Sequence, residues 1–281
     1  MKLSTETLKT IPVFGIAGNF AEHLAQAGEA SDFVGVKTEC EEAPKGLFPV
    51  YIPGMSNFLG VFPLSSSEIK ADFSQNPRLQ IEPELALLFD VDYTQNRQIE
   101  KLRPSAFAAF NDCSNRIQAT KISIKKNWGS ASTGLAEHWI ELDQFSKGGL
   151  LDQFHIACYL KRDEQVYAYG IDSPVAGYSY CHQQLVDWMV QQFNHQPDVG
   201  PLESLMPMLT IADYPGKIIV SLGATRYSAL GETTYLQPGD QLGVFVYAPE
   251  KLGVEQLVQA MKTDTPLDQA FCSSLIQTVQ P

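Results

Sequence analysis

The sequence has few cationic residues. It contains 20 lysines and arginines against 32 aspartates and glutamates in 281 residues, which gives a formal net charge of −12. A nucleic-acid-binding protein needs a basic surface against the phosphates, and anionic membranes attract the same kind of surface. We therefore expect neither nucleic acid nor a membrane as a partner.

Long apolar runs and paired cysteines are also missing. No run approaches the roughly 20 apolar residues of a membrane-spanning helix, and the first ten residues lack the apolar core of a signal peptide. The cysteines are odd in number, form no C-x-x-C, and lie at Cys40, Cys113, Cys158, Cys181 and Cys272. Because disulfide frameworks belong to oxidising compartments, we interpret these residues as reduced thiols in a cytoplasmic protein.

Most of the chain has a strand pattern. Apolar and polar residues alternate in several short segments after residue 139, whereas residues 181–195 form the one clear later helix. We predict a mixed α+β fold that is mainly β. The expected parts are an N-terminal helix with an irregular lid (1–78), a β core (79–248) and an appendage (249–281), all within one compact domain.

Two carboxylates stand at the entrance to an apolar run, in LQIEPELALLF at 79–89. In an extended strand, Glu82 and Glu84 would point to the same side. Two like charges that close are costly unless one takes a proton or a cation lies between them. Asp112 follows a second apolar run and would be a third oxygen ligand for Mg²⁺, Mn²⁺ or Ca²⁺. The alternative is that both glutamates are solvated at a strand edge.

Two segments resemble the fumarylacetoacetate hydrolase family. EPELALLF at 82–89 is similar to its E-x-E-L-A strand, and FNDCSNR at 110–116 to its N-D-x-S/T-x-R segment. The resemblance runs from about Gly15 to Tyr247 and indicates a divergent branch. It implies a mixed β-roll or β-sandwich with a few covering helices, a homodimer, and Mg²⁺ or Mn²⁺ held by Glu82, Glu84 and Asp112.

A third segment, GNFAEHLAQAGE at 18–29, resembles the family's G-x-N-Y-x-x-H-x-x-E motif on a helix. The match assigns Asn19 to substrate binding and His23 to proton transfer. Gln26 stands where hydrolytic members have the Glu that forms a dyad with the His, and an amide cannot hold the charge that would raise the basicity of His23. Glu29 would lie on a different helical face unless the helix ends at Gly28. The alternative for His23 is a helix-surface residue.

Three further residues are assigned by the resemblance. KISIKKNWGSASTGL at 121–135 resembles a segment whose lysine contacts the substrate carboxylate. Lys126 aligns best and Lys125 competes, because on a strand only one of them can point into the site. Arg116, which ends the N-D segment, and Thr225, in a glycine-containing stretch near the C-terminal strands, are the remaining substrate-binding candidates.

The resemblance implies a metal-dependent enzyme that acts on a small anionic 2-oxoacid. The reaction would be C–C hydrolysis of an acylpyruvate, decarboxylation of oxaloacetate or keto–enol tautomerisation, through a metal-stabilised enolate. Gln26 favours the latter two reactions, because water activation would be poor without a carboxylate. The alternative function is a non-catalytic protein of the same fold that binds metal or oxoacid.

Overall fold

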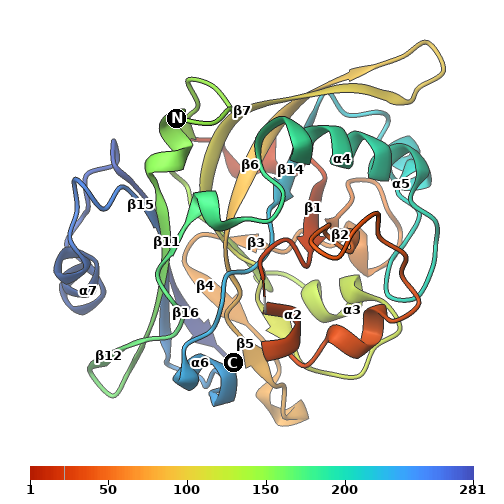
Figure 1. Cartoon of the computed structure of the whole chain (residues 1–281). Coiled ribbons are helices and arrows are strands. Elements are labelled where there is room, and N and C mark those ends of the chain that lie inside the picture. The colour runs from red at the N-terminus through yellow and green to blue at the C-terminus, as the bar shows by residue number, and fades with distance from the viewer. Residues whose placement is uncertain (22) are drawn as a thin grey trace.

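A computed structural model describes residues 1–21 and 23–281. The larger of its two main sheets has a central antiparallel hairpin and parallel pairs nearer its edges (Figure 1). Its strand order is β2 (Gly46–Tyr51), β1 (Val13–Ala17), β14 (Lys217–Ser221), β6 (Pro83–Tyr93), β7 (Ile99–Asn111), β9 (Thr133–Leu135) and β3 (Leu64–Ser65), with β10 (Ile140–Glu141) paired to β7.

The smaller main sheet packs against this one. Its order is β12 (Gln165–Ala168), β11 (His155–Arg162), β15 (Gln241–Tyr247), β16 (Cys272–Gln280) and β4 (Glu68–Lys70), with β13 (Ser173–Pro174) paired to β11. Strands β15 and β16 contact β7, and β11 and β15 contact β6. Large apolar side chains, including Phe89, Phe107 and Phe154, are fully buried. The mainly β fold predicted from the sequence is confirmed.

The longer helices cover the outer faces of these sheets. The predicted helix at 181–195 is α4 (His182–His195), which contacts β2 and β7; its Phe193 ring lies 4.9 Å from the ring of Phe14. Helix α5 (Met206–Ile211) packs on α4. Helix α7 (Val254–Thr263) lies on the other side of the molecule, against β11, β12 and β15 (Figure 1).

The remaining elements are short. They are α1 (Thr5–Leu8), α2 (His23–Gln26), α3 (Ile122–Lys126), α6 (Ala229–Thr233), the paired strands β5 (Leu79–Gln80) and β8 (Ser114–Asn115), and several single 3₁₀ turns. Within residues 1–21 and 23–281, no helix is both long and apolar enough to cross a bilayer. The five cysteines are free thiols, and Cys113 is buried.

The two strands of the β6–β7 hairpin position the predicted metal ligands. The hairpin turns at 94–98, where the Thr94 amide donates to the Gln98 carbonyl. At its other end Glu84 pairs with Phe110, and the Asp112 amide donates to the Glu82 carbonyl at 3.1 Å. Antiparallel pairing therefore brings residues 82–84 beside residue 112.

One element differs from its sequence-based prediction. Residues 122–126 form the short helix α3 and not a strand, and both Lys125 and Lys126 are buried. Neighbouring residues on a helix are about 100° apart, not on opposite faces as in a strand. The two lysines can therefore each reach an acidic partner inside the molecule. The expected strand is wrong, although of the two lysines only Lys126 lines the cavity that contains Glu82, Glu84 and Asp112.

Candidate functional site

The three predicted metal ligands come together in the structure. Glu82, Glu84 and Asp112 each offer one carboxylate oxygen, and these atoms lie within 4.8 Å of one another. Their exposed fractions are 4%, 1% and 1%, so the alternative of solvated strand-edge glutamates does not hold. Three hard oxygen donors in this arrangement suit Mg²⁺ or Mn²⁺. We call these three residues the acidic triad.

Backbone contacts fix the members of the triad. Glu84 accepts a hydrogen bond from the Gly223 amide at 2.9 Å. Gly223 has φ +104°, and a Cβ there would lie 3.1 Å from the Ile16 carbonyl oxygen, so the approach requires glycine. The Glu82 amide donates to the Asn111 side chain at 3.1 Å, and that side chain donates across to Gln277 on β16 at 3.1 Å.

Lys126 lies among these carboxylates. Its Nζ is 2.6 Å from Oε2 of Glu82 and 2.6 Å from Oδ2 of Asp112, and it also donates to the Asp112 carbonyl at 3.2 Å. Its exposed fraction is 2%. Of the two competing lysines, Lys126 is therefore the one that contacts the triad, where it acts as an internal counter-cation.

The triad carboxyls titrate differently because their surroundings differ. Burial raises the pKa of Glu82, but Lys126 and Arg116 outweigh burial and hold this pKa well below its usual value. Burial and the charge of Asp112 raise the pKa of Glu84 well above its usual value. Burial, only partly offset by Lys126, raises the pKa of Asp112 to about 6. The negative charge of the cluster is thus incompletely balanced by the protein.

Arg116 lies behind Glu82 and fixes its position. Its Nη2 is 2.6 Å from Oε1 of Glu82 and 2.8 Å from the Tyr227 hydroxyl, and its Nε donates to Gln80 at 2.7 Å. Its Nη1 donates to Glu29 at 2.8 Å. The guanidinium is therefore held by four partners. Three of them belong to the core, and the fourth, Glu29, belongs to the segment after helix α2.

Glu29 was not selected as a site residue from the sequence, yet it reaches the site. Helix α2 ends at Gln26, and Gly28 at φ +71° turns the chain inward. Glu29 is 7% exposed, and its Oε1 accepts from both Arg116 and Lys125, the latter at 3.2 Å. Its spacing from His23 pointed away from a site role, and only the early helix stop at Gly28 could have indicated one.

His23 is buried beside the triad. Its Nε2 lies 3.9 Å from Oε2 of Glu82, and its ring lies 5.1 Å from that of Tyr227. Within the described residues, no hydrogen-bond partner is found for its Nδ1. The amide of Gln26 is engaged elsewhere, because it donates to Glu232 at 2.7 Å and accepts from the Tyr227 amide at 2.9 Å.

The other two predicted substrate contacts are buried next to the site. Asn19 donates to the carbonyls of Tyr180 and Leu222 and accepts from the Tyr180 amide, so its side chain ties three segments together. The Thr225 amide donates to the Pro83 carbonyl at 3.1 Å. Its hydroxyl is buried, with no hydrogen-bond partner in the part of the chain that the structure describes.

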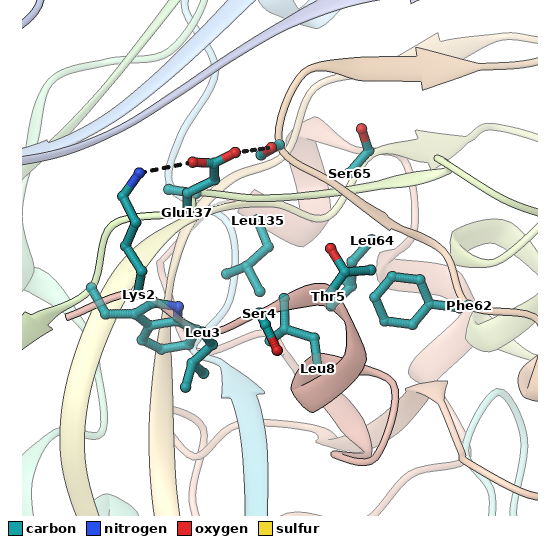
Figure 2. A pocket seen from close by; sticks show the side chains of 13 residues that line it. Lys2, Leu3, Ser4, Thr5, Leu8, Phe62, Leu64, Ser65, Leu135 and Glu137 are labelled. Carbon is teal, nitrogen blue, oxygen red and sulfur yellow. Dashed lines mark hydrogen bonds and ion pairs between the residues drawn. The ribbon is translucent and has the colours of Figure 1, made fainter.

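A small cavity lies at the triad, and larger hollows lie outside it. The cavity has a volume of about 20 Å³ and is also lined by His23, Glu29, Phe48 and Lys126. This is room for one water or one ion, so a 2-oxoacid requires these walls to move. A hollow of about 460 Å³ under residues 2–8 (Figure 2) contains none of the predicted site residues, and we assign it no role in the site.

Comparisons with solved structures place this fold. A fumarylacetoacetate hydrolase family protein from Yersinia pestis CO92 matches 84% of this chain and 89% of its own, with 13% identity and a TM-score of 0.51. A 5-carboxymethyl-2-hydroxymuconate delta-isomerase from Mycobacterium smegmatis matches 96% of this chain and 78% of its own, with 13% identity and a TM-score of 0.51.

A third solved structure is a 2-keto-3-deoxy-D-arabinonate dehydratase complexed with magnesium and 2,5-dioxopentanoate. It matches 96% of this chain and 72% of its own, with 13% identity and a TM-score of 0.50. No curated protein sequence matches the chain significantly. One family model, described as a family of unknown function (DUF5718), matches residues 29–279. The chain therefore belongs to this family of unknown function, and it has the fold of the fumarylacetoacetate hydrolase proteins.

Proposed function

We propose that this protein is a divalent-metal-dependent enzyme that acts on a small 2-oxoacid. One observation carries the proposal: three carboxylates that the hairpin brings within 4.8 Å are buried in a cavity. Burying three acids is unfavourable unless cations balance them. Lys126 and Arg116 balance part of this negative charge. The raised pKa values of Glu84 and Asp112 show that the remaining negative charge is not balanced.

The residues present fit a hard divalent ion. The donor set is all oxygen, and Oδ1 of Asp112 is buried without a hydrogen-bond partner among the described residues. Glu82, Glu84 and Asp112 would hold Mg²⁺ or Mn²⁺, which prefer such donors. When bound, the ion would serve as a Lewis acid toward the oxo-carboxylate end of the substrate.

Lys126 would change partners when the site is loaded. The Lys126 ammonium lies 2.6 Å from Glu82 and from Asp112, and it would leave these carboxylates if they held a divalent ion. Lys126 would then pair with the substrate carboxylate. The same movement would enlarge the 20 Å³ cavity, because the Lys126 side chain lines it.

His23 would carry the proton. Its Nε2 is 3.9 Å from Glu82 and its Nδ1 makes no hydrogen bond to a described residue, so the ring can exchange a proton at either nitrogen. Arg116 would hold Glu82 in place, and Asn19 and Thr225 would shape the backbone beside the substrate. These roles deepen the sequence-based assignments and are part of the proposal.

The position of Gln26 favours reactions that do not need activated water. Its amide is bound to Glu232 and Tyr227 and offers His23 no carboxylate. Decarboxylation of oxaloacetate or keto–enol tautomerisation is therefore proposed ahead of acylpyruvate hydrolysis. The dehydratase of the same fold, whose structure contains magnesium and 2,5-dioxopentanoate, supports an oxoacid as the substrate.

Thermal unfolding with oxalate tests the proposal. Oxalate resembles the oxo-carboxylate end of a 2-oxoacid, so in Mg²⁺ or Mn²⁺ it should raise the melting temperature, and EDTA should abolish the shift. A ligand at a hundredfold excess over its Kd stabilises a folded protein by about 2.7 kcal/mol. Glu84→Ala should lose the shift. Absence of any shift from metal or oxalate in the unaltered protein would contradict the proposal.

A second candidate is a metal-dependent binding protein without catalysis. The closed cavity and the engaged Gln26 amide favour it. Both candidates predict oxalate binding, so turnover separates them. Oxaloacetate and acylpyruvates are incubated with the Mg²⁺-loaded protein and with Glu84→Ala. Loss of substrate only with the unaltered protein supports the enzyme, whereas tight binding without turnover supports the binding protein.

A further inference from the structure

A polar hollow adjoins the triad cavity, and the two share Glu29. The hollow has a volume of about 370 Å³ and includes three cations and three anions among its walls: Arg78, Arg116, Lys125, Glu29, Asp32 and Glu232. Glu29 also lines the cavity at the triad. Its carboxylate therefore separates the proposed metal site from a space large enough for the tail of a small ligand.

Glu29 occupies a binding site for a carboxylate. Its Oε1 accepts from Nη1 of Arg116 at 2.8 Å and from Nζ of Lys125 at 3.2 Å. Both cations are buried, with exposed fractions of 8% and 6%. A guanidinium and an ammonium that converge in a desolvated place form strong, charge-assisted hydrogen bonds with a carboxylate.

Each of the two cations has further partners besides Glu29. Arg116 is also held by Gln80, Tyr227 and Glu82. Lys125 has a second partner in Asp32, at 2.9 Å. The core therefore fixes Arg116, Lys125 keeps a partner in the segment that follows Glu29, and the Glu29 carboxylate occupies the place between the two cations.

Glu29 itself belongs to a short segment at the surface. It follows Gly28, whose φ is +71°, and residues 30–32 after it are exposed. Its backbone makes two local hydrogen bonds: its amide donates to the Leu24 carbonyl at 2.9 Å, and its carbonyl accepts from the Asp32 amide at 3.0 Å. Rotation of the Glu29 side chain into the hollow would free both cations without disturbing either sheet.

We propose that the substrate is a 2-oxoacid with a second carboxylate, which displaces Glu29 and binds Arg116 and Lys125. Glu29 then acts as an internal competitor that closes the empty site. The inference rests on the proposed function for the oxo-carboxylate end only. Nη2 of Arg116 is 2.6 Å from the proposed metal ligand Glu82, so a short dicarboxylic acid spans from the triad to this pair of cations.

Calorimetric titration with two matched ligands tests the inference. 2-Oxoglutarate and 2-oxopentanoate have the same carbon chain, and only the first has a distal carboxylate. In Mg²⁺ the unaltered protein should prefer 2-oxoglutarate. Glu29→Gln removes the competing charge and should increase that preference by roughly tenfold or more. Lys125→Gln should reduce the preference, because one of the two cations is lost.

The control is Glu255→Gln. It removes an exposed carboxylate from helix α7, which packs on β11, β12 and β15 away from the hollow, so the preference should not change. Where Glu29→Gln is too unstable for calorimetry, 2-oxoglutarate should raise its melting temperature more than 2-oxopentanoate does. Glu29→Asp keeps the charge with a shorter reach and should give an intermediate preference. An unchanged preference in both Glu29 variants would overturn the inference.

The outcomes separate this inference from the proposed function. If both ligands bind equally in all variants and only with metal, the proposed function stands and the dicarboxylate inference fails. If neither ligand binds in Mg²⁺ or Mn²⁺, the proposed function fails. Glutarate lacks the oxo group. If glutarate binds in EDTA and binds more tightly to Glu29→Gln, the carboxylate site stands independently of the metal.

Discussion

At the scale of single residues, Lys126 governs the charge of the site. It pairs with Glu82 and Asp112 at 2.6 Å each, in a place where a metal would compete with it. Burial alone would lower the pKa of Lys126, but the negative charges of Asp112 and Glu82 raise this pKa above its usual value. The ammonium is therefore charged at neutral pH and stabilises the metal-free protein.

Replacing Lys126 by Met should have opposite effects on stability and on metal affinity. In EDTA the melting temperature should fall, because removing one partner of a buried ion pair costs about 3–5 kcal/mol. Without the competing cation, Mg²⁺ or Mn²⁺ should bind roughly tenfold more tightly or better, and substrate turnover should be lost. Calorimetric metal titration is the measurement. Lys2→Met, which removes an exposed pair with Glu137, is the control, and weaker metal binding by Lys126→Met would contradict this account.

A carboxylate at position 26 should not create a working dyad. Gln26→Glu would face Glu232, to which Gln26 now donates at 2.7 Å. Two like charges at a partly exposed site should lower the free energy of unfolding by about 1 kcal/mol, with no gain in acylpyruvate hydrolysis. Urea unfolding measures this loss in the single variant. The double variant, with Gln26→Glu and Glu232→Gln together, should recover the lost stability. A large gain in hydrolysis would show that the side chain reaches His23 after all.

At the scale of elements, the β6–β7 hairpin sets the geometry of the triad. Asn111, at the end of β7, joins the Glu82 amide to Gln277 on β16, at 3.1 Å in each case. One buried amide thus links the hairpin, the smaller main sheet and a proposed metal ligand. The sheets are therefore part of the site and not only its scaffold.

Asn111→Ala should weaken both the fold and the metal site. It leaves the buried Glu82 backbone amide and the Gln277 side-chain oxygen Oε1 without the partners that Asn111 supplies, at a cost of about 2–3 kcal/mol, and frees the segment before Glu84 to move. Urea unfolding and metal titration measure the two effects. Asn57→Ala removes a part-buried cap contact to the Leu59 amide, away from the triad, and should cost about 1 kcal/mol. Equal losses in the two variants would contradict a central role for Asn111.

The buried side chain of Glu203 forms a hydrogen bond with helix α3. The Ser123 hydroxyl of α3 donates to Glu203. Burial raises the pKa of Glu203 to about 7, although Ser123 and Lys121 oppose the shift. A carboxyl with a raised pKa in the folded state contributes stability that is present below its unfolded pKa and lost as the pH rises through the folded pKa.

Glu203→Gln should therefore change how stability depends on pH. The free energy of unfolding of the unaltered protein, relative to Glu203→Gln, should be highest below about pH 4.5 and should fall by up to about 3 kcal/mol by pH 8. Urea unfolding of both proteins at pH 5, 6, 7 and 8 measures the difference. A difference that stays constant across this range would show that Glu203 titrates normally.

At the scale of the whole molecule, the two main sheets draw on distant parts of the chain. β1 pairs in parallel with β14, and β4 pairs in parallel with β16. Strands from all three segments expected from the sequence thus share the sheets. The expected homodimer and cytoplasmic location remain predictions, and light scattering during gel filtration tests the first.

The sequence by itself determined the mainly β fold and helix α4, which depend on local periodicity that a linear pattern records. It also indicated the acidic triad, through two glutamates two residues apart together with the resemblance of two segments to the fumarylacetoacetate hydrolase family. Only the tertiary structure decided that Lys126 contacts the triad, that Arg116 lies behind Glu82 and that Glu29 enters the site. These depend on which acid each buried cation meets, and the partners are distant in the sequence. Helix α2 ends at Gln26 and Gly28 turns the chain, which brings Glu29 inside.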